Sequence, residues 1–281
     1  MSELKITNSE WRMANSVESH PMVRARGVAA CSQRLSTLDI IRNLLLLLLL
    51  LTLMAACGGP EPQPLTLQAA PWQSGESSTY DITDLNGQFA GTTIYSIQKS
   101  TATQAGNWIV RRETEAQGNS EIVEVEITGD HLRPRQTNWA LTDGSGTETI
   151  VANYAQGVVD MQLTSKQSQM HTEQRTIPTD SYDAYTLMIL LRAMPLAKNY
   201  ATQMNIFTAL TGNLEQALVR VRGTEQIESD AGAFDTWRVE IKIGESKTQA
   251  WIGTNTPYPV VKYIDGRNGG TYLLSTFEAG K

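Results

Sequence analysis

The feature that most limits the fold of this chain is an alternation of apolar and polar residues with a period of two. Residues 237–243 read Trp-Arg-Val-Glu-Ile-Lys-Ile, and residues 123–127 and 219–222 repeat the pattern. Neighbouring side chains of a strand point to opposite faces, so each segment buries one face and exposes the other, as antiparallel sheets commonly do. Further strands are expected at 88–98, 107–114, 134–142, 147–154, 157–163, 200–209, 248–253, 259–264 and 271–278.

One segment departs from this alternation and has the spacing of a helix. Ala184, Leu187, Met188 and Leu191 recur at i, i+3, i+4 and i+7, and Asp180 is the expected N-cap. The helix is apolar on almost every side, so it should be enclosed by the sheet. These patterns predict an α+β fold for residues 79–281: a mostly antiparallel, curved sheet, or half-barrel, with one buried helix.

The N-terminal segment has the organisation of a secretory signal peptide over residues 1–56. Arg34 and Arg42 precede the leucine run Leu44–Leu51, and the small residues Ala55 and Ala56 follow it. A membrane-spanning helix is the alternative. At about 1.5 Å per residue, however, the apolar stretch would reach only about 20 Å of a hydrocarbon core about 30 Å thick. A signal peptide is therefore favoured.

Residues 53–57 read Leu-Met-Ala-Ala-Cys and resemble the lipobox of bacterial lipoproteins. The resemblance implies that Cys57 receives a lipid and becomes the first residue after cleavage. Met54 stands where that motif usually has leucine, and an unmodified interfacial thiol is the alternative for Cys57. The leader is long for its class, so Met22 would make a more ordinary start. We expect an exported protein held at the cell membrane or outer membrane, with its body outside the cytoplasm.

Residues 57–78 contain four prolines together with Gly and Ser, which is typical of a flexible tether. The expected mature chain carries 17 basic and 25 acidic residues, a net charge of −8. Such a body repels polyanions, so we expect no binding to nucleic acid.

The C-terminal half carries short motifs in a fixed order. They are Leu-Arg-x-x-Pro-Leu at 191–196, Gly-x-Glu at 223–225 and Ala-Gly-Ala-Phe at 231–234. Over about residues 180–279 this order resembles a family of uncharacterised exported proteins, itself distantly similar to the lipoprotein carriers LolA and LolB. The resemblance implies a half-barrel and an apolar cavity that could hold acyl chains. It implies no catalytic residues.

The sequence contains none of the common catalytic or metal-binding motifs that we looked for. His131 and His171 are isolated from one another in the sequence, which has no HExxH, GxSxG or CxxC motif. We therefore expect neither enzyme activity nor a metal or cofactor site.

Large apolar side chains supply a candidate pocket lining, although an ordinary core would use the same residue types. The candidates are Trp108, Trp139, Tyr185, Leu187, Met188, Leu191, Phe207, Trp237 and Trp251. Arg111, Arg112, Arg133 and Arg135 either hold an acidic headgroup at the pocket mouth or lie on the wet face opposite glutamates such as Glu121.

Two functions are consistent with these features. In the first, a lipid-anchored envelope protein binds an apolar ligand such as a lipid or acyl chain, with affinity from apolar burial. In the second, a non-catalytic scaffold docks another envelope protein through a sheet edge or an exposed face.

Overall fold

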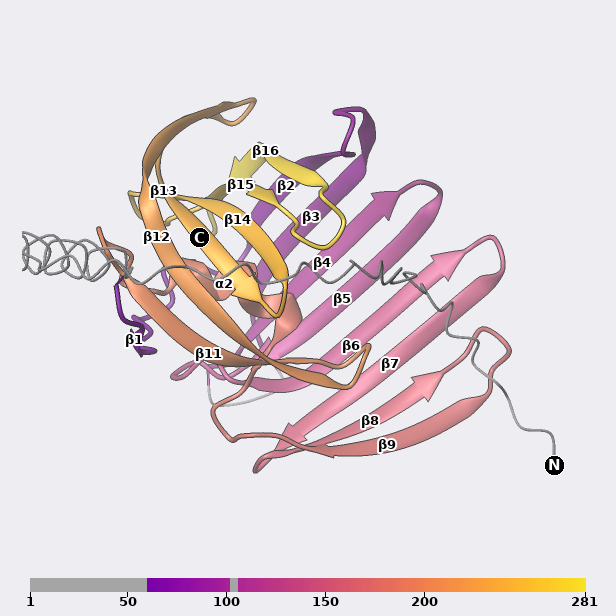
Figure 1. Cartoon of the computed structure of the whole chain (residues 1–281). Helices are drawn as coiled ribbons and strands as arrows, with labels where there is room; N and C mark the ends of the chain where they lie inside the picture. Colours follow the sequence, from indigo (N-terminus) through magenta and orange to yellow (C-terminus); the bar gives the residue numbers. More distant parts are fainter. Residues whose placement is uncertain (1–59, 102–105) are drawn as a thin grey trace, which may run out of the picture. The chain divides into compact units, whose positions relative to one another are not determined.

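The computed structural model describes residues 60–101 and 106–281, which belong to the compact unit Gly58–Lys281. Strands make up 61% of these residues and helical turns 4% (Figure 1). The helical elements are the 3-10 turn η1 (Ala184–Thr186) and the helix α2 (Leu187–Arg192). The strands are β1 (Gln63–Pro64), β2 (Glu76–Thr83), β3 (Phe89–Lys99), β4 (Trp108–Ala116), β5 (Asn119–Ile127), β6 (Pro134–Asp143), β7 (Gly146–Ala155), β8 (Val158–Thr164), β9 (Met170–Thr176), β10 (Tyr182–Asp183), β11 (Ala201–Thr208), β12 (Asn213–Ser229), β13 (Gly232–Ile243), β14 (Ser246–Gly253), β15 (Val260–Ile264) and β16 (Thr271–Glu278).

All of these strands join one sheet, in the order β1-β11-β12-β13-β14-β15-β16-β2-β3-β4-β5-β6-β7-β8-β9, with β10 also on β11. The pairings of β1 and β10 with β11 are parallel, so the sheet is mixed. The pairing of β16 with β2 is antiparallel and connects the last strand of the chain to the first long one. Both halves of the chain therefore contribute to a single sheet.

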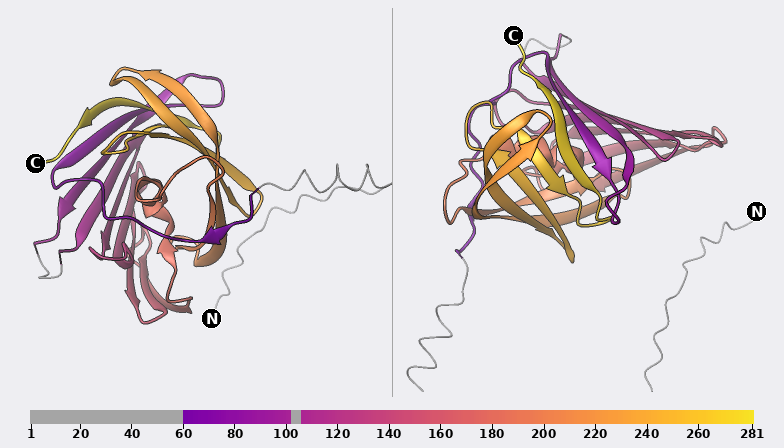
Figure 2. Two further views of the ribbon diagram at one scale, coloured as in Figure 1. Left: turned by 90° about the vertical axis from the view of Figure 1, so that its left-hand side faces the viewer. Right: turned by 90° about the horizontal axis from the view of Figure 1, so that it is seen from above.

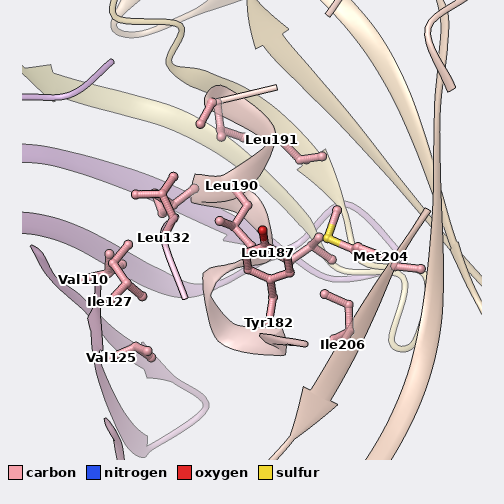
Figure 3. Close-up of a cluster of buried hydrophobic side chains, with 14 of the residues drawn as sticks. Val110, Val125, Ile127, Leu132, Tyr182, Leu187, Leu190, Leu191, Met204 and Ile206 are labelled. Carbon is pink, nitrogen blue, oxygen red and sulfur yellow. The ribbon is translucent and has the colours of Figure 1, made fainter. Parts of the chain in front are cut away.

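The sheet bends round on itself, and α2 lies inside the bend (Figure 2). Leu190 and Leu191 of α2 are fully buried, as are Val239 and Ile241 of β13. The labelled side chains of Figure 3 come from β4, β5, β10, β11, α2 and the loop between β5 and β6, and they meet in this interior. The concave face of the sheet and the helix thus share one core.

The predicted α+β class is wrong, because the described residues are nearly all sheet. The helix is shorter than its periodicity indicated, since its first expected turn is the 3-10 turn η1. Asp183 and not Asp180 caps this turn, accepting a hydrogen bond from the backbone N–H of Tyr185 at 2.7 Å. Six helical residues fill the bend of the sheet but do not form a layer of their own.

Residues that the sequence assigned to the tether pack against the body. Trp72 is 3% exposed, β1 pairs with β11, and the Gln68 N–H donates to the carbonyl of Ala193 at 2.7 Å. The ordered body therefore begins well before residue 79, because a proline-rich segment can still bury its few large apolar side chains. In the range that the structure describes, no helix is long and apolar enough to cross a membrane.

Candidate ligand-binding cavity

A cavity of about 330 Å³ opens on the concave side of the sheet, at the N-terminal end of α2. Strands from both halves of the sheet, the helical elements η1 and α2, and two hairpin turns contribute to its wall. Its lining residues are Tyr95, Arg112, Thr114, Glu121, Ala184, Tyr185, Leu187, Met188, Thr208, Leu210, Thr211, Ile243, Ser246, Thr248, Tyr263, Asp265, Arg267, Asn268 and Tyr272.

Strand parity places Arg112 in this cavity. Trp108 and Val110 are buried on the concave face of β4, and Arg112 follows them at the same spacing of two. On the neighbouring strand, Val123 is the register partner of Arg112 and is 1% exposed. Arg112 therefore points inward, although its side chain remains 19% exposed at the cavity.

Glu121 contacts residues on both neighbouring strands, β4 and β6. One of its carboxylate oxygens forms an ion pair with Arg112 Nη2, and the other accepts a hydrogen bond from Trp139 Nε1 at 2.7 Å. Burial acts to lower the pKa of Arg112, but interactions with Tyr95 and Glu121 outweigh it and raise that pKa. The guanidinium is therefore permanently charged and held in one position.

Tyrosine side chains form much of the remaining wall. Tyr263 and Tyr272 stack with ring centroids 4.0 Å apart and an interplanar angle of 8°. The Tyr185 ring lies 5.3 Å from the Arg112 guanidinium carbon. Burial raises the pKa of Tyr185 and Tyr263, so both phenols are neutral at physiological pH. Each ring offers a ligand both an apolar face and a hydroxyl group.

A groove of about 550 Å³ lies beside the cavity along β6 to β9. Its apolar wall includes Trp139, Ile150, Leu163 and Leu210. Leu210 lines both the cavity and the groove and is 43% exposed, while the Glu121–Trp139 hydrogen bond connects their walls. The rest of the groove wall is mostly polar and includes Glu148, Gln169 and His171, so the two adjacent spaces offer both apolar and hydrogen-bonding surface, which suits an amphiphilic molecule.

Buried hydrogen bonds fix the position of η1 at the cavity. The Asp183 carboxylate accepts from Thr137 Oγ1 at 2.7 Å, from Tyr154 OH at 2.5 Å and from the backbone N–H of Tyr185. These donors come from β6, β7 and η1. They hold Tyr185 at the cavity wall and connect it to the sheet.

The structure separates the candidate pocket residues into several environments. Tyr185, Leu187 and Met188 line the cavity, and Trp139 lines the groove. The others lie elsewhere. Trp108, Leu191 and Phe207 are buried in the main core, Trp237 lines a separate cavity of about 240 Å³, and Trp251 packs in a small cluster with Ile227 and Val261.

The sequence did not single out several residues that complete the cavity. The sequence left Arg112 either at a pocket mouth or on the wet face opposite Glu121. The spacing of two that relates Arg112 to Val110, and Glu121 to Val123, was the signal that could have assigned both to the concave face. Thr208, Tyr263 and Tyr272 had no such signal, because only the closure of the sheet between β16 and β2 brings their strands near β4.

Cys57 and the leader lie outside the described residues. Within residues 60–101 and 106–281, no group of three or more His, Cys, Asp or Glu side chains is arranged to hold a metal ion. His131 is largely exposed beside Asp130, whereas His171 lines the groove.

The fold of this chain is similar to that of a solved structure. A β-barrel-like protein of the DUF1849 family from Brucella abortus matches with a TM-score of 0.51 at 11% identity, over 74% of this chain and 98% of that one. At this identity the likeness concerns the fold alone.

Two other solved structures match with lower scores. A Bacteroides fragilis protein, provisionally described as exported and YmcC-like in fold, has a TM-score of 0.29 at 14% identity over 76% of this chain and 100% of its own. A Parabacteroides distasonis protein, provisionally described as a lipoprotein, has a TM-score of 0.30 at 12% identity over 77% and 100%. Neither score supports a conclusion about this chain.

A comparison with curated proteins finds no match. The profile of DUF3108, a family described as proteins of unknown function, matches residues 79–265. This confirms the expected membership of a family of unknown function and extends the resemblance upstream of residue 180. The similarity to LolA and LolB stays a prediction. The match covers most of the strands that form the cavity, and the chain belongs to the DUF3108 family.

Proposed function

We propose that this protein is a non-catalytic, lipid-anchored envelope protein that binds an amphiphilic ligand on the concave face of its sheet. The apolar part of the ligand lies in the groove along β6 to β9, and its polar part lies in the cavity at Arg112. The single observation that carries this proposal is that the two spaces are adjacent: Leu210 lines both, and Glu121 of the cavity wall accepts a hydrogen bond from Trp139 of the groove wall.

The packing of the helix supports an amphiphile over a purely apolar ligand. Leu190 and Leu191 are fully buried by protein, so an acyl chain has no room beside them. Open space begins instead at Leu187 and Met188, where tyrosine, arginine and hydroxyl side chains form most of the wall. A ligand that fits here needs hydrogen-bonding groups at one end.

If Cys57 carries the lipid, the packed N-terminal segment would hold the body near the membrane. Gln63 is already fixed in the sheet through its pairing with Thr202. The six residue-to-residue steps from Cys57 to Gln63 can span at most roughly 20 Å, at about 3.5 Å per extended residue. A ligand could then pass between the membrane and the cavity over a short distance.

Native mass spectrometry of the full chain, extracted from membranes, tests this proposal. We expect a non-covalently bound mass in addition to any covalent lipid. Leu210→Arg should remove that mass, because it places a charge where the cavity and groove meet. Leu214→Arg is the matched control, since Leu214 is also 43% exposed but lines neither space. Absence of any bound mass, or equal loss in both variants, would contradict the proposal.

A second candidate function is docking of a protein partner by strand addition. Strand β9 is an edge of the sheet, and six of its seven residues are exposed. An unpaired edge can accept a strand from another chain. Gln174→Pro, at a β9 residue that lines neither the cavity nor the groove, would weaken such a complex but leave the lipid-bound mass unchanged.

A further inference from the structure

Two buried polar atoms in the cavity wall lack a hydrogen-bond partner within the described protein. They are Nε of Arg112 and Oγ1 of Thr208, and both residues line the same cavity. Thr208 is only 5% exposed, at the end of β11. An unpaired buried polar group costs about 1–3 kcal/mol, so each of these two side chains would gain a partner by turning toward a ligand in the cavity. One is a donor and the other can donate or accept.

Three of the four charged side chains of the cavity wall are already in ion pairs. Arg112 is paired with Glu121, and Arg267 Nη2 lies 3.4 Å from Glu215 Oε2. The remaining acid, Asp265, accepts a hydrogen bond from the Arg267 backbone N–H at 2.9 Å. An anionic head group would have to compete with Glu121 for Arg112, and a cationic one would lie beside that guanidinium. An uncharged head group meets neither cost.

The rest of the wall suits a head group with several hydroxyls. Thr114, Thr211, Ser246 and Thr248 contribute hydroxyl groups that can both donate and accept. The tyrosine rings offer apolar faces to the carbon atoms of such a group. We propose that the head group of the bound amphiphile is a sugar, one oxygen of which accepts a hydrogen bond from Arg112 Nε while another pairs with Thr208 Oγ1. This inference rests on the proposed function and adds the class of the ligand.

Photolabelling of the full chain in isolated membranes tests this assignment. Two probes share one diazirine-bearing dodecyl chain and differ only in the head group, a β-glucoside or a phosphate monoester. Mass spectrometry then measures labelling of the groove residues Ile150 and Leu163. We expect the glucoside to label them at least fivefold more than the phosphate.

Substitutions at the two residues with unpaired atoms should change labelling by the glucoside alone. Thr208→Val and Arg112→Lys should each reduce glucoside labelling at least threefold and leave phosphate labelling unchanged. Arg111→Lys is the matched control. Arg111 immediately precedes Arg112 in β4, points to the opposite face of the sheet and forms an ion pair with Glu113. Equal or stronger labelling by the phosphate would overturn the sugar assignment while keeping the amphiphile proposal. Labelling of the groove by neither probe would instead contradict the proposed function itself.

Discussion

Arg192 and Glu76, 116 positions apart, form an ion pair in which each side chain is only 2% exposed. The contact is bidentate, with Nη1–Oε1 at 2.5 Å and Nη2–Oε2 at 3.0 Å. Arg192 also donates to the carbonyls of Pro257 and Tyr258 at 2.8 and 3.1 Å. A single side chain at the end of α2 thus connects the helix to β2 and to the loop before β15.

Breaking this pair should be costly, because it leaves a buried charge without its partner. Arg192→Met should lower the free energy of unfolding by about 3–5 kcal/mol, measured by urea denaturation. The double variant Arg192→Met/Glu76→Gln should recover part of that loss, since the uncompensated carboxylate is gone. A single variant as stable as the wild type would contradict this account, as would a double variant less stable than the single.

The packing of Trp72 gives a prediction about where the folded body begins. The Trp72 ring meets Trp108 edge to face at 6.1 Å, and the Arg192 guanidinium carbon lies 5.5 Å from its centroid. Trp72→Ala should cost about 3–5 kcal/mol of unfolding free energy. Leu85→Ala should change it by less than about 0.5 kcal/mol, because Leu85 is 78% exposed. If the two variants are equally stable, residues 60–75 are a tether and not part of the body.

The buried Asp183 carboxylate should make stability depend on pH in a defined direction. Burial raises its pKa above the ordinary value of 3.8, although hydrogen bonds from Tyr154 and Thr137 oppose the shift. The folded chain therefore holds this proton more tightly than the unfolded chain. Its contribution to stability is fully present below pH 3.8 and is lost as pH rises through the folded pKa.

Comparison with Asp183→Asn isolates this effect from other titrations. The unfolding free energy of the wild type minus that of the variant should increase as pH falls from 7 to 4, measured by urea denaturation at each pH. The asparagine keeps an acceptor oxygen for Tyr154 and Thr137 but does not titrate. A difference that is constant, or that decreases toward low pH, would show that the carboxyl does not have a raised pKa.

The prediction of membrane anchoring depends on Cys57. Cys57→Ala should leave either an uncleaved precursor or an unanchored chain, because no thiol remains to receive the lipid. Fractionation of cells and the intact mass of the chain measure both outcomes. Cys31→Ala is the matched control, since it removes the other cysteine, which lies within the expected signal peptide. Normal anchoring and processing of Cys57→Ala would contradict the lipobox assignment.

Much of the sheet could be predicted from the sequence because its strands alternate locally. The pattern from Trp237 to Ile243 lies within β13, and similar patterns marked β5 and β12. Strand β2 was not predicted, because its buried positions begin with Glu76, whose burial depends on Arg192 far along the chain. Strand β9 had no apolar face to detect, since it is a polar edge strand.

The fold class and the cavity depend on information that local patterns lack. The helical spacing around Leu187 was real, but it gives no length, and the expected first turn is the 3-10 turn η1, which Asp183 caps. The cavity forms only after β16 pairs with β2 and brings Tyr263 near Arg112. Pairing between distant strands is set by the whole chain, so neither the volume nor the complete lining could be read from residue types.

A crystal structure of Gly58–Lys281 with a dodecyl glucoside brominated at the end of its chain would test the central claim most directly. These residues form one compact unit, and anomalous scattering locates the bromine independently of the fitted ligand. We predict a bromine peak in the groove bounded by Trp139, Leu163 and Leu210, with the head group beside Arg112. A bromine peak only on the outer face of the sheet, or an empty groove at saturating ligand, would contradict the claim.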